Sequence, residues 1–476
     1  MFLRAARHGW AGLCVVSLAF MAPPVAAQGA RAGTDAGWAA DVPALASLVA
    51  FARGESELRA APAAYASGRA AMLRRVASMP AAQASEAKRR WHESWLDELS
   101  SLDFDGLSVE GKVDYIVLRN EVEQGMTYDS LPGGGRGPIG DEALRAHLRR
   151  AMIPYTPEEL LAIAEREFRW MDDALRSASQ RMGFGADWRA AQEKVKQAAV
   201  PPGGKPGLIR DLAYQSEAFL EAHDMLTVPP LMREIWRMNM RGPESQLTNP
   251  FFTGGLTITI SYPTDDMTHD FKMMSMRGNN PHFNRATVHH ELIPGHGLQS
   301  WMTSRFNSHR SSGGPFWGEG WALYFEFVLW DAGFPRGPED EVGMLFWRMH
   351  RAARIVFSLN YHLGRMTAEQ AVDYLVERVG FERSNAAGEV RRSVGAAPLY
   401  QLAYMIGGLQ FRALRREFVE SGRMTEREFH DTVLQGGRLP VEMVRLRLLG
   451  EGLTRDYRTQ WRFAGDPLAA QGGDER

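Results

Sequence analysis

Apolar side chains recur at helical spacing through most of the chain between residues 28 and 225. The stretch "TPEELLAIAEREFRWMDDALRSASQRMG" begins with Thr156 and has Glu159 three residues later, which is typical of a capping box at the start of a helix. The stretches "EAKRRWHESWLDELSSL" and "KVDYIVLRNEVEQGM" have the same amphipathic character. "LPGGGRGPIG" at residues 131–140 predicts a loop. Residues 28–225 are therefore predicted to form an N-terminal helical half.

The pattern changes near residue 226. "LTVPPLMREIWRMNM" is predicted to be extended, and "GGLTITISYP" alternates apolar and hydroxyl side chains as a half-buried strand does. "DFKMMSM" is expected to add a third short strand, and helices are expected to resume after Pro281. Residues 226–476 then form a second half with one small sheet in front of a histidine-rich helix. The predicted fold class is mostly α.

Composition and charge limit the classes of partner. The 476 residues are 45% apolar and 24% charged, as in an ordinary folded protein. A formal net charge of −2 gives no electrostatic reason to expect nucleic acid or an anionic membrane as a partner.

The first residues have the pattern of a secretory signal peptide. Arg4 and Arg7 precede the apolar run "AGLCVVSLAFMA", and small residues predict cleavage near Ala27. The apolar run is too short for a retained transmembrane helix, so we expect a periplasmic or secreted protein without stable membrane insertion. Cys14 is the only cysteine and lies inside this segment, without the small preceding residue that lipid attachment requires. Disulfides and cysteine chemistry are thus excluded from the expected mature chain.

The candidate chemistry lies in "TVHHELIPGHGLQ", residues 287–299. His290 and His296 are six residues apart, which on an ideal helix separates them by about 240° in azimuth and about 9 Å along the axis. They can share a metal ion only if the helix is distorted between them. Pro294 removes a backbone donor and Gly295 tolerates unusual dihedral angles, so we predict a break at residues 293–295 that returns His296 to the side of His290. The alternative is a buried helix with hydrogen-bonded histidines, which Pro-Gly ends.

A third metal ligand is expected in "FWGEGWALYFEFVLW". Glu319 and Glu326 are seven residues apart and share one face of an otherwise apolar helix, where unpaired carboxylates are costly. Glu319, flanked by two glycines, is the predicted ligand, and Glu326 is predicted to orient a ligand histidine from behind. The alternative places one or both carboxylates at a helix edge in water.

"HELIPGHGLQ" and "EGWALYFE" resemble the exported bacterial family called domain of unknown function 885, with its patterns H-E-x-x-P-G-H-x-x-Q and E-G-W-A-L-Y-x-E. The resemblance implies a zinc metallopeptidase-like helical fold with a deep cleft or channel. It also implies His290, His296 and Glu319 as Zn2+ ligands and Glu291 as the catalytic base. Thimet-type oligopeptidases are more distant relatives of the same type.

Two further stretches resemble family patterns less closely. "RAARIVFSLNYH" includes His362, and "APLYQLAYMIGG" includes Tyr404, although Tyr400 stands where the family has glutamine. These two matches make Tyr404 and His362 the candidate donors to a reaction oxyanion, against the alternative that both are core residues.

The expected function is a zinc-dependent hydrolase, a peptidase that cleaves short peptides with metal-activated water and Glu291 as general base. Two alternatives are a zinc hydrolase of a non-peptide amide or ester, and a non-catalytic exported binding protein with a structural metal site. A structural site would have four protein ligands, whereas a hydrolytic site keeps one position open.

Overall fold

The computed structural model describes residues 42–51, 54–129, 137–241, 253–261, 263–394 and 398–468. The predicted signal segment, residues 1–27, lies outside the described residues, as does most of the predicted loop at residues 131–140. The described residues are mainly helical, with a single small sheet among them, as the sequence predicts.

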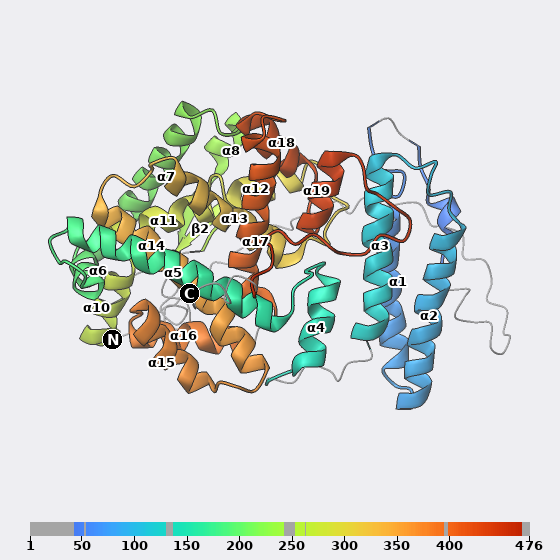
Figure 1. The fold of residues 1–476 in the computed structure, drawn as a ribbon, viewed down its shortest axis with the longest axis horizontal. Coiled ribbons are helices and arrows are strands. Elements are labelled where there is room, and N and C mark those ends of the chain that lie inside the picture. Colours follow the sequence, from blue (N-terminus) through green and yellow to red (C-terminus); the bar gives the residue numbers. More distant parts are fainter. Residues whose placement is uncertain are drawn as a thin grey trace, which may run out of the picture.

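Three helices stand side by side at one end of the long axis of the molecule (Figure 1). They are α1 (Ala61–Val76), α2 (Ala81–Ser101) and α3 (Val109–Tyr128), preceded by a 3-10 turn at Leu45–Ser47. Tyr65 of α1 stacks on Trp91 of α2 at a ring separation of 5.3 Å, and Trp95 meets the same tyrosine edge-on. The Ser108 hydroxyl caps α3 by accepting a hydrogen bond from the Gly111 amide. Aromatic packing between helices therefore holds this end together.

Four helices continue the chain into the main body. They are α4 (Asp141–Arg150), α5 (Pro157–Arg181), α6 (Trp188–Lys196) and α7 (Lys205–Ala222), with a 3-10 turn at Pro202–Gly204. The predicted capping box at the start of α5 is confirmed, because Thr156 and Glu159 each bond to the other's backbone amide.

The sheet has two short parallel strands, β1 (Arg237–Met240) and β2 (Thr257–Ile260), with Arg237 paired with Thr257. Two predictions for this region are wrong. Residues 230–235 form helix α8 (Pro230–Ile235), because Pro230 suits the first helical position. "DFKMMSM" belongs to helix α10 (His269–Gly278), whose first turn the Thr268 hydroxyl caps by accepting from the Phe271 amide.

The following residues are helical as far as Leu449 and contain every element that approaches the candidate site, apart from the segment before β2 and the end of α10. The helices are α11 (Pro281–Glu291), α12 (His296–Thr303), α13 (Gly314–Asp331), α14 (Pro338–His362), α15 (Ala368–Val379), α16 (Arg383–Val394), α17 (Tyr400–Arg415), a π-helical turn (Arg416–Glu420), α18 (Glu426–Gln435) and α19 (Val441–Leu449).

Helices α13 and α17 cross at very close range. A Cβ atom built on Gly320 would lie 2.6 Å from the Cα of Gly407, so both positions require glycine. The two glycines that flank Glu319 would be expected to give its backbone freedom near a helix start. Glu319 instead lies inside regular helix, and Gly320 serves the helix crossing. The crossing fixes Glu319 relative to the tyrosines of α17.

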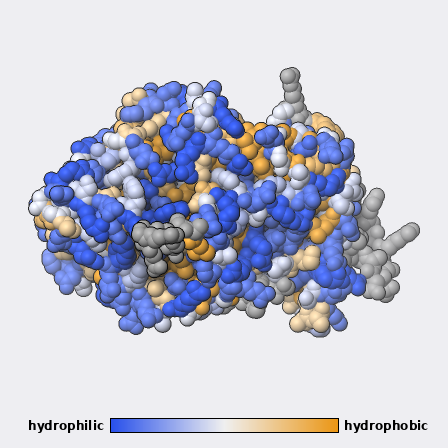
Figure 2. Space-filling view, viewed as in Figure 1, coloured by the Kyte–Doolittle hydropathy of each residue, from blue (hydrophilic) through white to orange (hydrophobic). Residues whose placement is uncertain are grey.

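Two large hydrophobic clusters form the core, and each draws residues from both sides of residue 225. The predicted boundary there remains a prediction. The face in Figure 2 is largely hydrophilic, with hydrophobic side chains gathered where the α1–α3 end meets the main body. Within the described part of the chain, no helix is both long enough and apolar enough to span a bilayer.

Candidate metal centre

The histidine-rich helix breaks where the sequence predicts. Helix α11 ends at Glu291 and α12 begins at His296. In the break, the Gly295 amide donates to the His289 carbonyl at 2.9 Å in place of a regular helical bond. The imidazole rings of His290 and His296 consequently lie 4.9 Å apart, centre to centre, and are nearly perpendicular. The predicted break is thus confirmed.

Three predicted ligands converge across this break. His290, His296 and Glu319 each offer a ligand atom within 4.8 Å of the others. Oε2 of Glu319 lies 3.0 Å from Nε2 of His296 and 3.6 Å from Nε2 of His290. Burial would raise the pKa of Glu319, but the neighbouring histidines outweigh it and hold that pKa well below its ordinary value. Glu319 is therefore an anion at neutral pH.

Glu326 lies behind His290, about two helical turns from Glu319 on the same face of α13. Its Oε1 is 2.8 Å from Nδ1 of His290 and 3.3 Å from Nη2 of Arg351. Burial would raise the pKa of Glu326, but Arg351 and His290 together lower it. A carboxylate at the far nitrogen of a histidine fixes the orientation of the ring. This is the role predicted for Glu326 from the sequence.

Glu291 shares a cavity of about 240 Å³ with the three candidate ligands. The segment before β2 packs closely on its backbone, where the Gly255 amide donates to the Glu291 carbonyl at 3.0 Å. A Cβ atom on Gly254 would lie 2.1 Å from that carbonyl oxygen, so the approach requires glycine. The segment before β2 thereby forms one wall of the site, with Thr253 and Gly254 lining the cavity. The other lining residues are Thr253, Asn279, Asn284, Thr287, Trp347, Arg351, Arg354, Arg392, Tyr400 and Tyr404.

Two tyrosines of α17 face the candidate ligands. The ring of Tyr404 lies parallel to that of His290, with centres 6.0 Å apart, and its hydroxyl donates to the Tyr400 hydroxyl at 3.3 Å. The Tyr400 hydroxyl donates in turn to Oε1 of Glu319. Tyr404 is a predicted site residue, whereas no role is predicted for Tyr400 from the sequence. The spacing of four residues, which puts both on one helical face, is the signal that could have found it.

His362 is not among the described residues that line this cavity. It ends α14, eight residues beyond Arg354, which corresponds to about 12 Å along a helix. Its carbonyl accepts from the Gly140 amide, and burial together with the charge of His147 lowers its pKa to about 4. His362 is a buried helix-end residue, and we do not propose it as an oxyanion donor. His289, next to the candidate ligand His290, is fully buried against Phe334.

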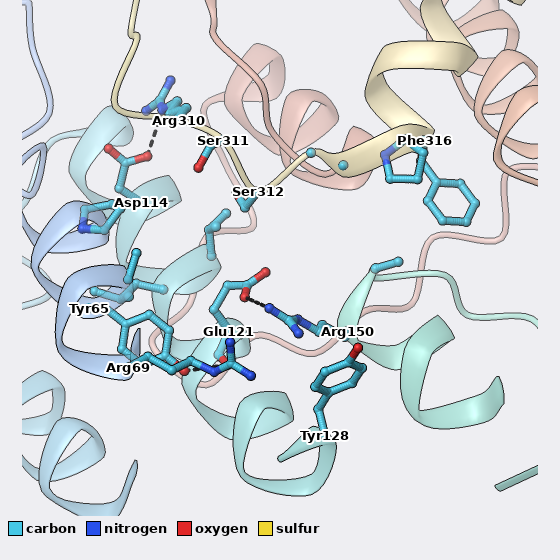
Figure 3. Close-up of a pocket in the computed structure, with 18 of the residues that line it drawn as sticks. Tyr65, Arg69, Asp114, Glu121, Tyr128, Arg150, Arg310, Ser311, Ser312 and Phe316 are labelled. Carbon is cyan, nitrogen blue, oxygen red and sulfur yellow. Dashed lines mark hydrogen bonds and ion pairs between the residues drawn. The ribbon is translucent and has the colours of Figure 1, made fainter. Parts of the chain in front are cut away.

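A larger cavity of about 490 Å³ adjoins the metal centre through Tyr400, which lines both. Figure 3 shows its polar walls, where Asp114 faces Arg310 and Glu121 faces Arg150. Its residues come from α1, α3, α4, the segment 309–313, the start of α13 and the start of α17. The cavity therefore lies where the α1–α3 end meets the main body.

Comparison with known proteins gives a family and a fold. The family described as bacterial protein of unknown function, DUF885, matches residues 126–448. A candidate lipoprotein of unknown function from Shewanella oneidensis is similar in structure, with a TM-score of 0.57, 18% identity, and coverage of 83% of this chain and 77% of its own. A candidate lipoprotein from Colwellia psychrerythraea has a TM-score of 0.55, 20% identity, and coverage of 83% and 72%. No curated protein matches the chain.

Proposed function

We propose that this chain, which belongs to the bacterial DUF885 family of unknown function, is a zinc-dependent hydrolase of short peptides. One observation carries the proposal: His290, His296 and Glu319 converge on one point, and Glu291 lines the same cavity. Three protein ligands leave a coordination position for water, as hydrolytic zinc sites require and structural sites do not.

The donor set fits zinc. Two imidazole nitrogens and one carboxylate oxygen are a recurrent ligand set of catalytic zinc, and the set contains no thiolate. In the metal-free protein, burial opposes protonation of His296, but Glu319 prevails and raises the pKa of His296 to about 9. A divalent cation would replace that proton as the charge partner of Glu319.

Zinc, when bound, supplies Lewis-acid activation of water and of the substrate carbonyl at neutral pH. Glu291 accepts a proton from the attacking water as the water oxygen bonds to the carbonyl carbon. The same carboxylic acid then gives this proton to the leaving nitrogen as the carbon–nitrogen bond breaks. Hydrolysis of one peptide bond consumes one water molecule and releases a carboxylate and an amine.

Tyr404 is the proposed donor to the oxyanion that forms during attack. Burial and the charge of Glu319 raise the pKa of Tyr404 to about 12, in spite of the arginines beside it, so its hydroxyl keeps its proton at neutral pH. Tyr400 positions the site by donating to Glu319. The enclosed metal cavity and the larger cavity beyond Tyr400 are consistent with a short, flexible substrate.

The proposed location is outside the cytoplasm. The similarity in fold to two candidate lipoproteins supports this proposal, together with the signal-like pattern at residues 1–27.

The test is digestion of a mixed peptide library by dialysed protein with and without added zinc, read by mass spectrometry. The zinc-loaded protein is expected to cleave peptides. Glu291→Gln is expected to reduce the rate by about a hundredfold to ten-thousandfold with zinc content unchanged, because only the general base is removed. The exposed Glu369 on α15 gives a matched control, and Glu369→Gln is expected to behave as the wild type.

Two results would contradict the proposal in different ways. Zinc that raises thermal stability without hydrolysis of any peptide or small amide would indicate a structural site. Glu291-dependent hydrolysis of small esters or amides, with peptides left intact, would keep the hydrolase and reject the peptide substrate.

A further inference from the structure

We propose that an arginine cluster beside the metal centre is a binding subsite for a carboxylate group of the substrate. The cluster comprises Arg351 and Arg354 of α14 and Arg392 of α16, which line the cavity, and Arg241, which adjoins it. The inference rests on the proposed peptidase function and adds the substrate group that the site selects.

The buried guanidiniums are only partly satisfied by protein groups. Nε of Arg354 donates to Oε1 of Glu389 at 2.8 Å, but its Nη1 has no hydrogen-bond partner among the described residues. Nη2 of Arg351 lies 3.3 Å from Glu326, while its Nε lacks a partner within the same described set. Arg354 is 3% exposed and Arg351 is 4% exposed. Buried donors of this kind are costly unless a ligand or water satisfies them.

Positive charge exceeds negative charge on this side of the cavity. Glu389 serves both Arg354 and Arg392 as partner, so one carboxylate faces two guanidiniums. Glu326, the partner of Arg351, is also shared with His290. A zinc ion at the ligands would add further positive charge. An anion bound between the metal centre and the arginines would balance this excess.

Arg241 adds a fourth guanidinium at the edge of the cavity. Its Nη2 donates to the hydroxyl of Thr253, a cavity-lining residue, at 2.9 Å. Burial and the charge of Arg392 both lower the pKa of Arg241. The residue that follows β1, together with α14 and α16, thus brings a fourth cation to the edge of the same cavity.

A carboxylate is the anion that this arrangement suits in a peptidase. Planar guanidiniums match the two oxygens of a carboxylate, and every unmodified linear peptide carries one at its C-terminus. With that carboxylate on the arginines, the acyl side of the substrate would extend past Tyr400 toward the larger cavity. An acidic side chain near the cleaved bond offers the same chemistry, and the test separates these two sources.

The test compares peptide pools that differ only in charge, with the zinc-loaded protein. One pool has free C-termini, a second has C-terminal amides, and a third has free termini with every Asp and Glu replaced by Asn and Gln. We expect kcat/KM to be at least about tenfold higher for the pools that carry the charged group bound by the subsite. The pool without that group loses a charge-assisted hydrogen bond.

Arg392→Gln is expected to remove this preference through KM. Its side chain is 40% exposed, so the variant can fold. Arg392→Lys should restore part of the preference. Arg391→Gln makes the same charge change at the exposed neighbouring position of α16 and should retain the full preference.

A binding measurement separates failure of the subsite from failure of the peptidase. Glu291→Gln protein is titrated with N-acetyl-alanyl-alanine and with its C-terminal amide by calorimetry. Stronger binding of the acid, lost in the double variant with Arg392→Gln, supports the subsite even if no peptide is cleaved. Equal cleavage of all three pools, together with equal or absent binding of the two probes, would overturn the inference.

Discussion

At the scale of single residues, Glu319 is surrounded by groups that keep it charged and oriented. One oxygen faces Nε2 of His296 at 3.0 Å, and the other accepts from Tyr400. Tyr404 continues this chain through Tyr400 and lies flat beside the ring of His290. The two tyrosines therefore have separable roles: Tyr400 holds a ligand, whereas the hydroxyl of Tyr404 can turn to the substrate.

Tyr404→Phe tests the role of that hydroxyl. We expect kcat to fall about a hundredfold with KM and zinc content nearly unchanged, because a donor to an oxyanion acts mainly in the transition state. Peptide hydrolysis and metal analysis measure these quantities. Tyr214, which is 53% exposed, provides the control, and Tyr214→Phe should have no effect. An unaltered kcat in Tyr404→Phe would reject Tyr404 as the donor.

At the scale of elements, the break between α11 and α12 decides whether the histidines can meet. Gly295 lies against the last turn of α11, where a Cβ atom would be 1.8 Å from the His290 carbonyl oxygen. Glycine is required here by this close approach. The path of the chain around His290 therefore depends on glycine, which has no side chain, at position 295.

Gly295→Ala is expected to destabilise the protein by about 1–3 kcal/mol, because the added methyl group forces the backbone apart. Zinc affinity should fall at the same time, since His296 begins the helix that must shift. Denaturant unfolding and metal titration measure the two effects. Gly318→Ala is the matched control, because a Cβ atom there meets nothing within 4 Å. Normal zinc affinity in Gly295→Ala would show that the break does not position His296.

At the scale of the whole molecule, a buried ion cluster ties the α1–α3 end to the segment that precedes α13. Asp114 of α3 lies 2.7 Å from Nε of Arg310 and 2.8 Å from Nε2 of His309 (Figure 3). Burial would raise the pKa of Asp114, but His309 and Arg310 outweigh it and lower the pKa. This cluster also lines the larger cavity, so it links the shape of that cavity to the attachment of α3.

Asp114→Asn should lower the free energy of unfolding at neutral pH by about 1–3 kcal/mol, because Arg310 loses one of its two carboxylate partners and keeps Glu110. The folded pKa of Asp114 lies below its unfolded value of about 3.9, so its contribution is complete above that value and is lost as pH falls through the folded pKa. The difference between wild type and variant should therefore shrink below about pH 4. Urea unfolding across this range measures it.

The control for this prediction is the exposed pair of Asp173 and Arg176 on α5, whose side chains are 80% and 55% exposed. Asp173→Asn should change stability by less than about 1 kcal/mol. A difference between wild type and Asp114→Asn that stays constant from pH 7 to pH 3 would contradict the assignment of the effect to the Asp114 charge.

Local patterns were sufficient for the features that depend on neighbours in sequence. Helical periodicity predicted the helical character, Thr156 and Glu159 predicted a capping box, and the spacing of His290 and His296 required the break that the structure contains. The same local reasoning failed for residues 269–278, where a cap at Thr268 outweighs a short apolar run.

Only the tertiary structure decided which distant residues share the site. Tyr400 reaches Glu319 across the α13–α17 crossing, four arginines gather from three elements, and His362 lies away from the cavity despite its motif. The sequence by itself determined the helices, the break and the residue types available for a metal. The sequence could not determine which distant residues meet at the site. Helix crossings depend on close contacts such as that of Gly320 with Gly407, and no local pattern encodes such long-range packing.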